Sequence, residues 1–176
     1  MDNKDDRTLV ELLRQGNEDA FTVLHERYRR KLCVFLRRHT DDHIQAEDIA
    51  QNAFLKAFQN IETLRDGTKF KSWLYTIAYR IAVDDARKKR EITMDDSSVE
   101  QKSGEKLPDD IAISNEERAN IWTVAQNILT PDEFSAIWLR YAEDEKVESI
   151  ATIMNRSNGS VRVLLYRARK KLLESL

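Results

Sequence analysis

Apolar side chains recur at three- and four-residue intervals along most of the chain, which is the period of an amphipathic α-helix. In the first half, this pattern predicts four helices. A short one is expected at Thr8-x-x-Glu11, which has the form of a capping box. Three longer ones are expected over about 20–35, 49–61 and 70–90, separated by polar or glycine-containing breaks. No stretch shows the sustained alternation that is typical of a β-strand.

The second half predicts four more helices. One passes through residues 121–129 and ends before Thr130-Pro131-Asp132-Glu133. That quartet combines an N-cap, a proline at the first helical position and a capping box, so a helix over 134–141 is expected to start there.

The end of the chain has the order of a helix-turn-helix. A short helix over 147–154 is followed by Asn155-Arg156-Ser157 and by a longer basic helix from about Asn158. Asn155 suits the left-handed conformation of a C-cap, and Ser157 suits an N-cap. The buried face of the last helix is expected to carry four apolar residues, namely Val161, Leu165, Ala168 and Leu172.

The helical pattern is lost between the two halves, where acidic, serine and glycine residues replace large apolar ones. Such a segment cannot bury enough surface to offset its ordering entropy. The fold class is therefore predicted to be all-α, with two small helical domains and a flexible acidic linker. The expected boundaries are 1–90, 91–113 and 114–176.

Composition narrows the class of protein. Of 176 residues, 4 are Gly, 2 are Pro and 1 is Cys, which argues against glycine-rich phosphate loops and multi-cysteine zinc sites. The longest apolar runs are far shorter than a membrane span needs, so no membrane insertion is expected. Cys33 sits in an apolar run and is expected to pack as a small hydrophobe. No catalytic arrangement stands out, so we expect no enzyme activity, metal or cofactor.

Charge is unevenly spread although the net charge is only −2. Residues 65–90 carry eight basic and three acidic residues, a balance of +5. Residues 91–118 carry nine acidic and three basic residues, a balance of −6. Residues 156–171 carry six basic residues and no acidic one. Since phosphate neutralisation needs local rather than net charge, the two basic blocks favour nucleic-acid binding over a merely solvated surface.

The last helix is expected to meet base edges in the major groove through its first turns, as in other helix-turn-helix proteins. Arg162 is long enough to reach a guanine edge, whereas four later cations are expected at phosphates: Arg167, Arg169, Lys170 and Lys171. The simpler alternative is an ordinary helical hairpin with a basic, soluble face.

The helix over 70–90 combines aromatic and basic residues, which suits an unstacked single strand. Trp73 lies on its apolar face and is expected in the core. Tyr75 and Tyr79 lie off that face and are expected to be freer to stack on bases.

Three segments in this order resemble bacterial RNA polymerase sigma factors of the extracytoplasmic-function (ECF) group. Residues 46–58 resemble the polymerase-binding helix of that family, and residues 70–87 resemble its promoter −10 helix. Leu139-Arg140-Tyr141, Ile150-Ala151 and residues 159–172 resemble its −35 helix-turn-helix.

The resemblance implies the following site residues. The polymerase contact would comprise Asp48, Gln51, Asn52, Phe54 and Leu55. The −10 contact would comprise Arg65, Lys69, Lys71, Tyr75, Tyr79, Arg80, Asp84, Arg87 and Lys88. The −35 contact would comprise Arg156, Ser157, Asn158, Gly159, Ser160, Arg162, Arg167 and Arg169.

It also implies the function and partners of a cytoplasmic promoter-specificity subunit. Its partners would be core RNA polymerase, duplex −35 DNA, single-stranded −10 DNA and an anti-sigma factor. The chain departs from the family pattern at Asn52, Arg80 and Asn155. It also departs at Val163 and Leu164, so the −35 sequence is not expected to be typical.

Two other functions are compatible with the same pattern. A stand-alone dimeric helix-turn-helix regulator would bind a palindromic site without polymerase. A polymerase adaptor without DNA contact would be unaffected by Arg162→Ala or Arg167→Ala.

Overall fold

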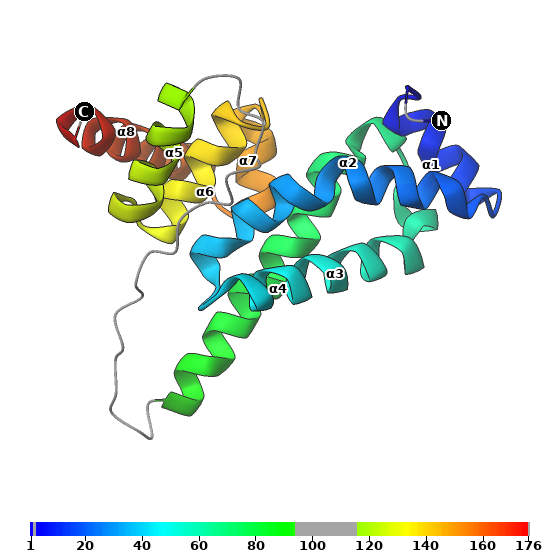
Figure 1. Ribbon diagram of the computed structural model, residues 1–176, viewed down its shortest axis with the longest axis horizontal. Coiled ribbons are helices and arrows are strands. Elements are labelled where there is room, and N and C mark those ends of the chain that lie inside the picture. Colours follow the sequence, from blue (N-terminus) through cyan, green and yellow to red (C-terminus); the bar gives the residue numbers. More distant parts are fainter. Residues whose placement is uncertain (2, 94–115, 176) are drawn as a thin grey trace.

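The computed structural model of the protein describes residue 1, residues 3–93 and residues 116–175; side chains 116–120 are not described. Helices make up the regular structure of these ranges, and no strand occurs in them (Figure 1). The described part thus agrees with the predicted all-α class.

The N-terminal unit contains four α-helices and three short 3-10 helices. The α-helices are α1 (Asp6–Arg14), α2 (Glu18–Leu36), α3 (His43–Gln59) and α4 (Phe70–Thr93), and the 3-10 helices are η1 (Arg37–His39), η2 (Ile61–Thr63) and η3 (Gly67–Lys69). The helices α2, α3 and α4 lie side by side and bury large apolar residues between them, including Leu24, Phe35, Phe54 and Leu74.

Helix α1 begins earlier than the sequence predicted. The Thr8 N–H donates a hydrogen bond of 2.8 Å to the Asp5 carboxylate, so Asp5 is the N-cap. The capping box proposed for Thr8 and Glu11 is therefore wrong. A charged carboxylate three residues upstream competes for the N–H group that the box would have used.

Gly67 lets α1 approach the loop before α4. A Cβ atom built on Gly67 would lie 2.9 Å from the Cα of Arg7, which is closer than two carbon atoms can pack. Because glycine has no side chain, helix α1 can pack directly against the start of the basic segment.

The C-terminal unit consists of α5 (Glu116–Ile128), α6 (Pro131–Tyr141), α7 (Val147–Met154) and α8 (Asn158–Ser175). Trp122, Phe134 and Trp138 form its aromatic core, with the two indole centroids 4.9 Å apart. The predicted capping box is confirmed, because the Thr130 side chain accepts from the Glu133 N–H and the Glu133 side chain from the Thr130 N–H.

The helix-turn-helix is confirmed. Asn155 adopts the left-handed conformation (φ 50°, ψ 51°) that ends α7. The Ser157 hydroxyl accepts from the Ser160 N–H at 3.1 Å and caps α8. Asn is among the few residues that adopt this conformation at low cost, so the turn follows from local sequence.

The boundary of the N-terminal unit lies slightly later than predicted. Helix α4 continues through Thr93, so positions 91–93 belong to the helix rather than to the linker. Positions 94–113 of the predicted linker, and the predicted start of the second unit at Ser114, lie outside the described residues.

The two units pack against each other, with α4 running along α7 and with α6 next to η1 (Figure 1). Lys71 of α4 pairs with Glu145 at 3.2 Å, and Lys31 of α2 pairs with Glu143 at 3.3 Å. The His39 ring lies 2.7 Å from the Ser135 hydroxyl. The contact is thus polar as well as apolar.

Within the described ranges, every helix is too short or too polar to cross a lipid bilayer.

Candidate functional site

Helix α8 has one buried face and one open face. All four residues that the sequence assigned to its buried face are buried. Of the eight residues predicted to contact the −35 duplex, Ser160 is half-buried and the other seven are exposed. The structure thus leaves the predicted DNA-reading side open to a partner.

The cations of this unit differ in how they are used. Lys171 donates to both carboxylate oxygens of Glu133, at 2.8 and 3.0 Å, and ties α8 to α6. Arg169 donates from Nε to the Leu165 carbonyl at 3.3 Å, and Arg156 pairs with Asp132. Lys171 thus has a structural role in this unit, and its predicted phosphate contact stays a prediction, while Arg162 and Arg167 are on the open face.

Glu133 carries the main charge of the α6–α8 contact. Burial raises the pKa of its carboxyl, but the hydrogen bonds from Lys171 and Thr130 outweigh it and leave that pKa below its usual value. The carboxylate is therefore ionised at neutral pH and holds the N-terminus of α6, where a negative charge is favourable.

Helix α4 is covered on two sides. One side packs on α2 and α3, and another packs on the C-terminal unit. Tyr75 is fully buried and Tyr79 is 6% exposed, with the Phe35 ring 5.0 Å from Tyr75 and 6.3 Å from Tyr79. The expectation that both tyrosines are free to stack on bases is wrong for this arrangement, because the second contact covers the side that helical periodicity marks as open.

Tyr79 belongs to a polar contact between the units. Its hydroxyl donates to the Asp132 carboxylate at 3.1 Å, and Arg156 pairs with the same carboxylate. Burial, followed by the charge of Asp132, raises the pKa of Tyr79 to about 12, so the hydroxyl remains a donor. Asp132 thus joins a residue predicted for the −10 strand to one predicted for the −35 duplex.

A different aromatic ring of α4 faces an open groove. Trp73 is half-buried and lines a groove of about 510 Å³ between α3 and α4. The α4 residues that share the groove follow helical spacing from it: Ile77, Arg80, Ile81, Asp84, Asp85 and Lys88. The expectation that Trp73 packs on the core is confirmed in part, because the ring is packed against the core on one side and borders the groove on the other. The cations and carboxylates at three- and four-residue steps from it mark this open side.

The remaining residues predicted for the −10 strand are distributed unevenly. Arg65 and Lys69 are exposed in the segment before α4, whereas Lys71 is half-buried at its ion pair with Glu145. Arg80 is exposed at the groove, and Arg87 pairs with Asp84 at 3.7 Å. The structure therefore brings only part of this set to one open surface.

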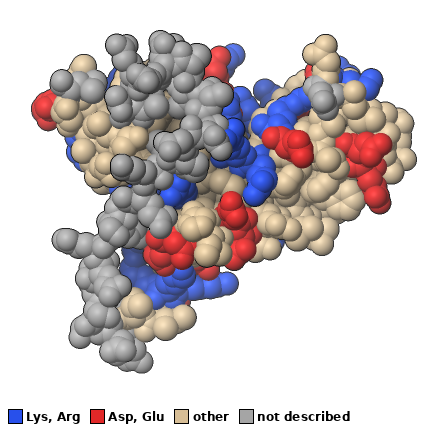
Figure 2. Space-filling model, viewed as in Figure 1, with Lys and Arg blue, Asp and Glu red and all other residues tan. Residues whose placement is uncertain are grey.

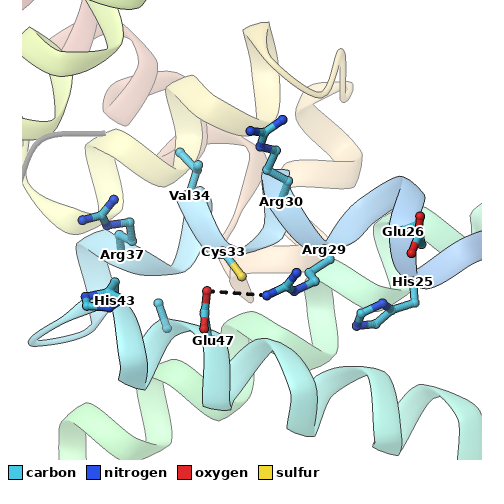
Figure 3. A pocket seen from close by; sticks show the side chains of 10 residues that line it. His25, Glu26, Arg29, Arg30, Cys33, Val34, Arg37, His43 and Glu47 are labelled. Carbon is cyan, nitrogen blue, oxygen red and sulfur yellow. Dashed lines mark ion pairs between the residues drawn. The ribbon is translucent and has the colours of Figure 1, made fainter. Parts of the chain in front are cut away.

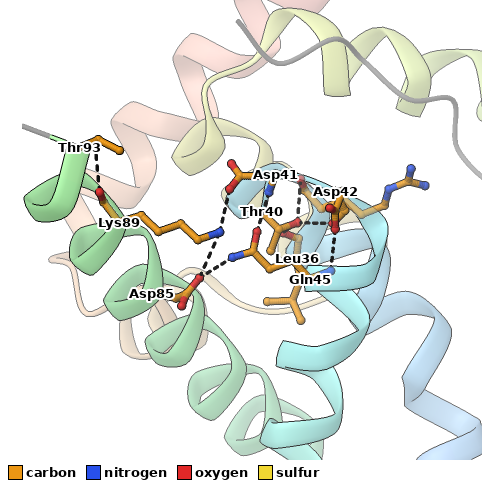
Figure 4. Close-up of polar contacts among 9 residues, drawn as sticks. Leu36, Thr40, Asp41, Asp42, Gln45, Asp85, Lys89 and Thr93 are labelled. Atoms are coloured by element: carbon orange, nitrogen blue, oxygen red, sulfur yellow. Dashed lines mark hydrogen bonds and ion pairs between the residues drawn. The ribbon is translucent and has the colours of Figure 1, made fainter. Parts of the chain in front are cut away.

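The end of α4 is tied to the corner between α2 and α3 (Figure 4). Lys89 pairs with Asp41 at 2.7 Å and with Asp85 at 3.8 Å, and the Gln45 side chain donates to Asp85. Asp42 caps α3 by accepting from the Gln45 N–H at 2.8 Å. One lysine of the basic run is thus used to hold the helix in place.

Helix α3 presents a mixed polar and apolar face. Asp48, Gln51, Asn52 and Leu55 of the predicted polymerase contact are exposed. Phe54 is only 2% exposed and packs beside His25, with ring centroids 4.6 Å apart, so in this structure it belongs to the core rather than to the exposed part of the predicted contact.

Phe58 takes the exposed position one turn later. It is 42% exposed, and its ring lies 5.2 Å from that of Phe21. Since Phe54 and Phe58 share the same helical spacing, the pattern alone cannot say which ring is buried. The structure adds Phe58 to the candidate face.

A pocket of about 600 Å³ lies between α2 and α3 (Figure 3). Arg29 of α2 pairs with Glu47 of α3 at 3.6 Å, and the Cys33 side chain lies beside this pair. Burial raises the pKa of the Cys33 thiol to about 11, so the thiol is protonated and unreactive at neutral pH. Over the described ranges, no three His, Cys, Asp or Glu residues cluster as metal ligands would.

Basic residues gather at two places on the visible surface. Figure 2 shows Lys and Arg along the middle of the molecule, where α2 passes the C-terminal unit, and again beside the end of α4, with Asp and Glu among them. The positive charge is therefore partly neutralised by the protein itself.

Comparisons with known proteins match both units. The models named Sigma-70 region 2 and Sigma-70, region 4 match residues 24–92 and 125–172. The "RNA polymerase sigma-H factor" of Pseudomonas aeruginosa is 34% identical, covering 97% of this chain and 93% of its own. The "ECF RNA polymerase sigma factor SigW" of Bacillus subtilis is 31% identical, covering 95% and 94%.

Solved structures also share the fold of this chain. The sigma factor RpoE of Bartonella quintana, in complex with the anti-sigma factor NepR, has a TM-score of 0.73 and 25% identity, covering 88% of this chain and 94% of its own. CnrH, in complex with the cytosolic domain of CnrY, shares the fold with a TM-score of 0.66 at 19% identity, covering 96% and 95%. The chain therefore belongs to the ECF group of RNA polymerase sigma factors.

Proposed function

We propose that this sigma factor directs core RNA polymerase to specific promoters, with α8 in the major groove of the −35 duplex, the α3–α4 groove at the melted −10 strand and α3 on the polymerase. The observation that carries the proposal is the match of region 2 and region 4 to the two helical units, with an open basic face on α8 and an open groove between α3 and α4. A stand-alone dimeric regulator is not favoured, because the N-terminal unit is accounted for by region 2.

Helix α8 suits duplex DNA for electrostatic and steric reasons. Its first turn has small polar residues, so the helix and its N–H groups approach the DNA closely. Arg162 on the open face has the length for a bidentate contact with guanine, and Arg167 is placed one turn further along for a phosphate.

The groove between α3 and α4 suits an unpaired strand. The Trp73 ring gives a stacking surface, while Arg80 and Lys88 give positive charge for the backbone. Lys71, Tyr75 and Tyr79 lie under or at the contact with the C-terminal unit. Their use by promoter DNA requires the two units to separate, so opening of this contact is part of the proposed mechanism.

Helix α3 suits a protein partner. Leu55 and Phe58 expose 47% and 42% of their surface beside the carboxylate of Asp48 and the amides of Gln51 and Asn52. An apolar centre with a polar rim is typical of protein interfaces. We assign this face to core polymerase.

We further propose an anti-sigma factor as a regulator, by analogy with RpoE and its bound NepR. The site of action would be the cytoplasm, where polymerase and DNA meet.

The test is transcription by purified core polymerase on a candidate promoter, with and without this protein. Promoter-specific initiation and stable core binding are expected, and the absence of both would reject the proposal. Asp48→Lys should weaken core binding because it reverses a charge in the polar rim of the α3 face. Glu174→Lys makes the same charge change at an exposed position at the far end of α8 and should leave core binding unchanged.

A further inference from the structure

One stripe of α8 points directly away from the C-terminal core. Taken one helical turn at a time, it runs from Gly159 through Val163 to Tyr166 and Arg167, and then to Lys170. All five are exposed, and the buried residues Val161, Leu165, Ala168 and Leu172 lie on the opposite side. A partner of this helix therefore meets the stripe first.

Val163 sits in the middle of that stripe without a role in the fold. Its side chain is 47% exposed, although Leu164 beside it is half-buried and packs against the core. The two residues of α8 that depart from the family pattern thus differ in role, because only Val163 faces outward. Val163 is therefore an apolar group that is available to a partner of the stripe.

Gly159, one turn earlier, has no internal reason to be glycine. A Cβ atom built there would meet only the Ser157 hydroxyl, at an ordinary distance of 3.9 Å. Glycine within a helix is less stable than alanine. The missing side chain is explained if the backbone at this point comes close to a partner, which also brings Val163 close.

The surrounding charge identifies the kind of partner. Arg167 and Lys170 belong to the stripe, Arg162 lies beside it, and no acidic residue occurs from Arg156 to Lys171. Such a surface favours a polyanion over a protein surface of mixed charge. In the major groove, the only apolar group on a base edge is the 5-methyl group of thymine, and apolar side chains contact it.

We infer that Val163 reads the 5-methyl group of a thymine in the −35 element, with Gly159 allowing the close approach. This specificity contact rests on the proposed binding of α8 to the −35 duplex. It adds a base preference to the guanine contact assigned to Arg162, since a valine selects thymine over cytosine by contact with the methyl group alone.

The test uses deoxyuridine, which lacks only that methyl group. With polymerase holoenzyme and a promoter identified by selection, each thymine of the −35 element is replaced in turn, and affinity is measured. One replacement should weaken wild-type binding about threefold to fivefold, the worth of one buried methyl group. With Val163→Ala, the same replacement should have no effect, and this variant should bind thymine DNA as weakly as wild type binds the uracil DNA.

Leu173→Ala is the matched control, because Leu173 is an exposed apolar residue near the end of the same helix. It should retain the full response to the missing methyl group. Both substitutions remove an exposed side chain and place a better helix former, so both variants should fold. Gly159→Ala should weaken binding to thymine DNA more than binding to uracil DNA, because the added methyl group holds Val163 away from the base, and it should not lower the melting temperature.

Three results would overturn the inference. The first is specific −35 binding in which no thymine replacement depends on Val163, which would leave the proposed function intact. The second is a loss in Val163→Ala of core binding rather than of DNA affinity, which would make the stripe a protein contact. The third is a holoenzyme without any promoter specificity, which would remove the proposed function as well.

Discussion

The two basic helices of this sigma factor are used in different ways. Helix α8 packs with one face only, and its cations at the open side, Arg162 and Arg167, stay exposed. Helix α4 packs on both the N-terminal bundle and the C-terminal unit, which covers Tyr75 and Tyr79. Two basic helices with similar sequence patterns thus differ in exposure: the outer face of α8 is free for a partner, whereas that of α4 is partly covered by the other unit.

The difference has a physical source in carboxylates supplied by the C-terminal unit. Asp132 accepts from Tyr79, Glu145 pairs with Lys71, and Glu143 pairs with Lys31. DNA phosphates would compete for the same donors, so promoter binding exchanges one set of charge contacts for another. The −35 surface needs no such exchange at Arg162.

The largest expected effect is a loss of stability when the packed face of α8 is changed, and it shows whether this helix has only one packed face. Leu165→Ala should destabilise the C-terminal unit by about 2–5 kcal/mol, because it leaves a cavity at a position that is 5% exposed. Val163→Ala, two residues earlier on the open face, should change stability by about 0.5 kcal/mol or less. Chemical denaturation measures both, and similar losses would contradict the two-faced description of α8.

The next effect separates base reading at α8 from strand capture at α4. Arg162→Ala should reduce discrimination among −35 sequences by about 1–3 kcal/mol if the guanidinium makes a bidentate guanine contact. Arg80→Ala should instead slow promoter opening whatever the −35 sequence. Equal losses of Arg162→Ala affinity on every −35 sequence would make Arg162 a phosphate contact.

The C-terminal unit should lose stability in acid. The pKa of Glu133 is lowered by its hydrogen bonds in the folded state, so its contribution is present above the carboxyl's unfolded pKa and is lost as pH falls through the lower folded value. Glu133→Gln should cost about 1 kcal/mol at neutral pH, because it weakens a charged hydrogen bond to the half-exposed Lys171. It should also flatten the acid limb of a stability-against-pH curve, and an unchanged limb would contradict the assignment.

The smallest effect is expected at the contact between α4 and the C-terminal unit. Tyr79→Phe removes the hydroxyl that donates to Asp132 and should weaken the contact between units by about 0.5–1.5 kcal/mol. Hydrogen exchange along α4 should then become faster. Tyr141→Phe makes the same change at an exposed tyrosine and should leave exchange unaltered, so equal acceleration in both variants would argue against the contact.

Local sequence accounted for most helices and for the turn of the helix-turn-helix. Caps such as Thr130 and Ser157 act within three residues of themselves, so they can be recognised without knowing the fold. The exception is the start of α1, where Asp5 and Thr8 are both acceptable caps and differ only in the competition between them.

Residue roles were harder to predict where two rings share one spacing. Phe54 and Phe58 lie one turn apart on α3, but only the first is buried. Trp73 packs against the core as expected, but one side of it also borders an open groove. Helical periodicity gives the direction of a side chain but not how far the neighbouring helix extends over it.

By itself, the sequence determined the helical class, the division into two units, the recognition helix and the family resemblance, because these depend on short-range spacing, capping and the order of local motifs. Only the tertiary structure decided that Tyr75 and Tyr79 are covered, that Lys171 and Lys89 hold helices together, and that Val163 rather than Leu164 faces outward. Those outcomes depend on contacts between residues far apart in the chain, where burial and charge pairing are set by packing.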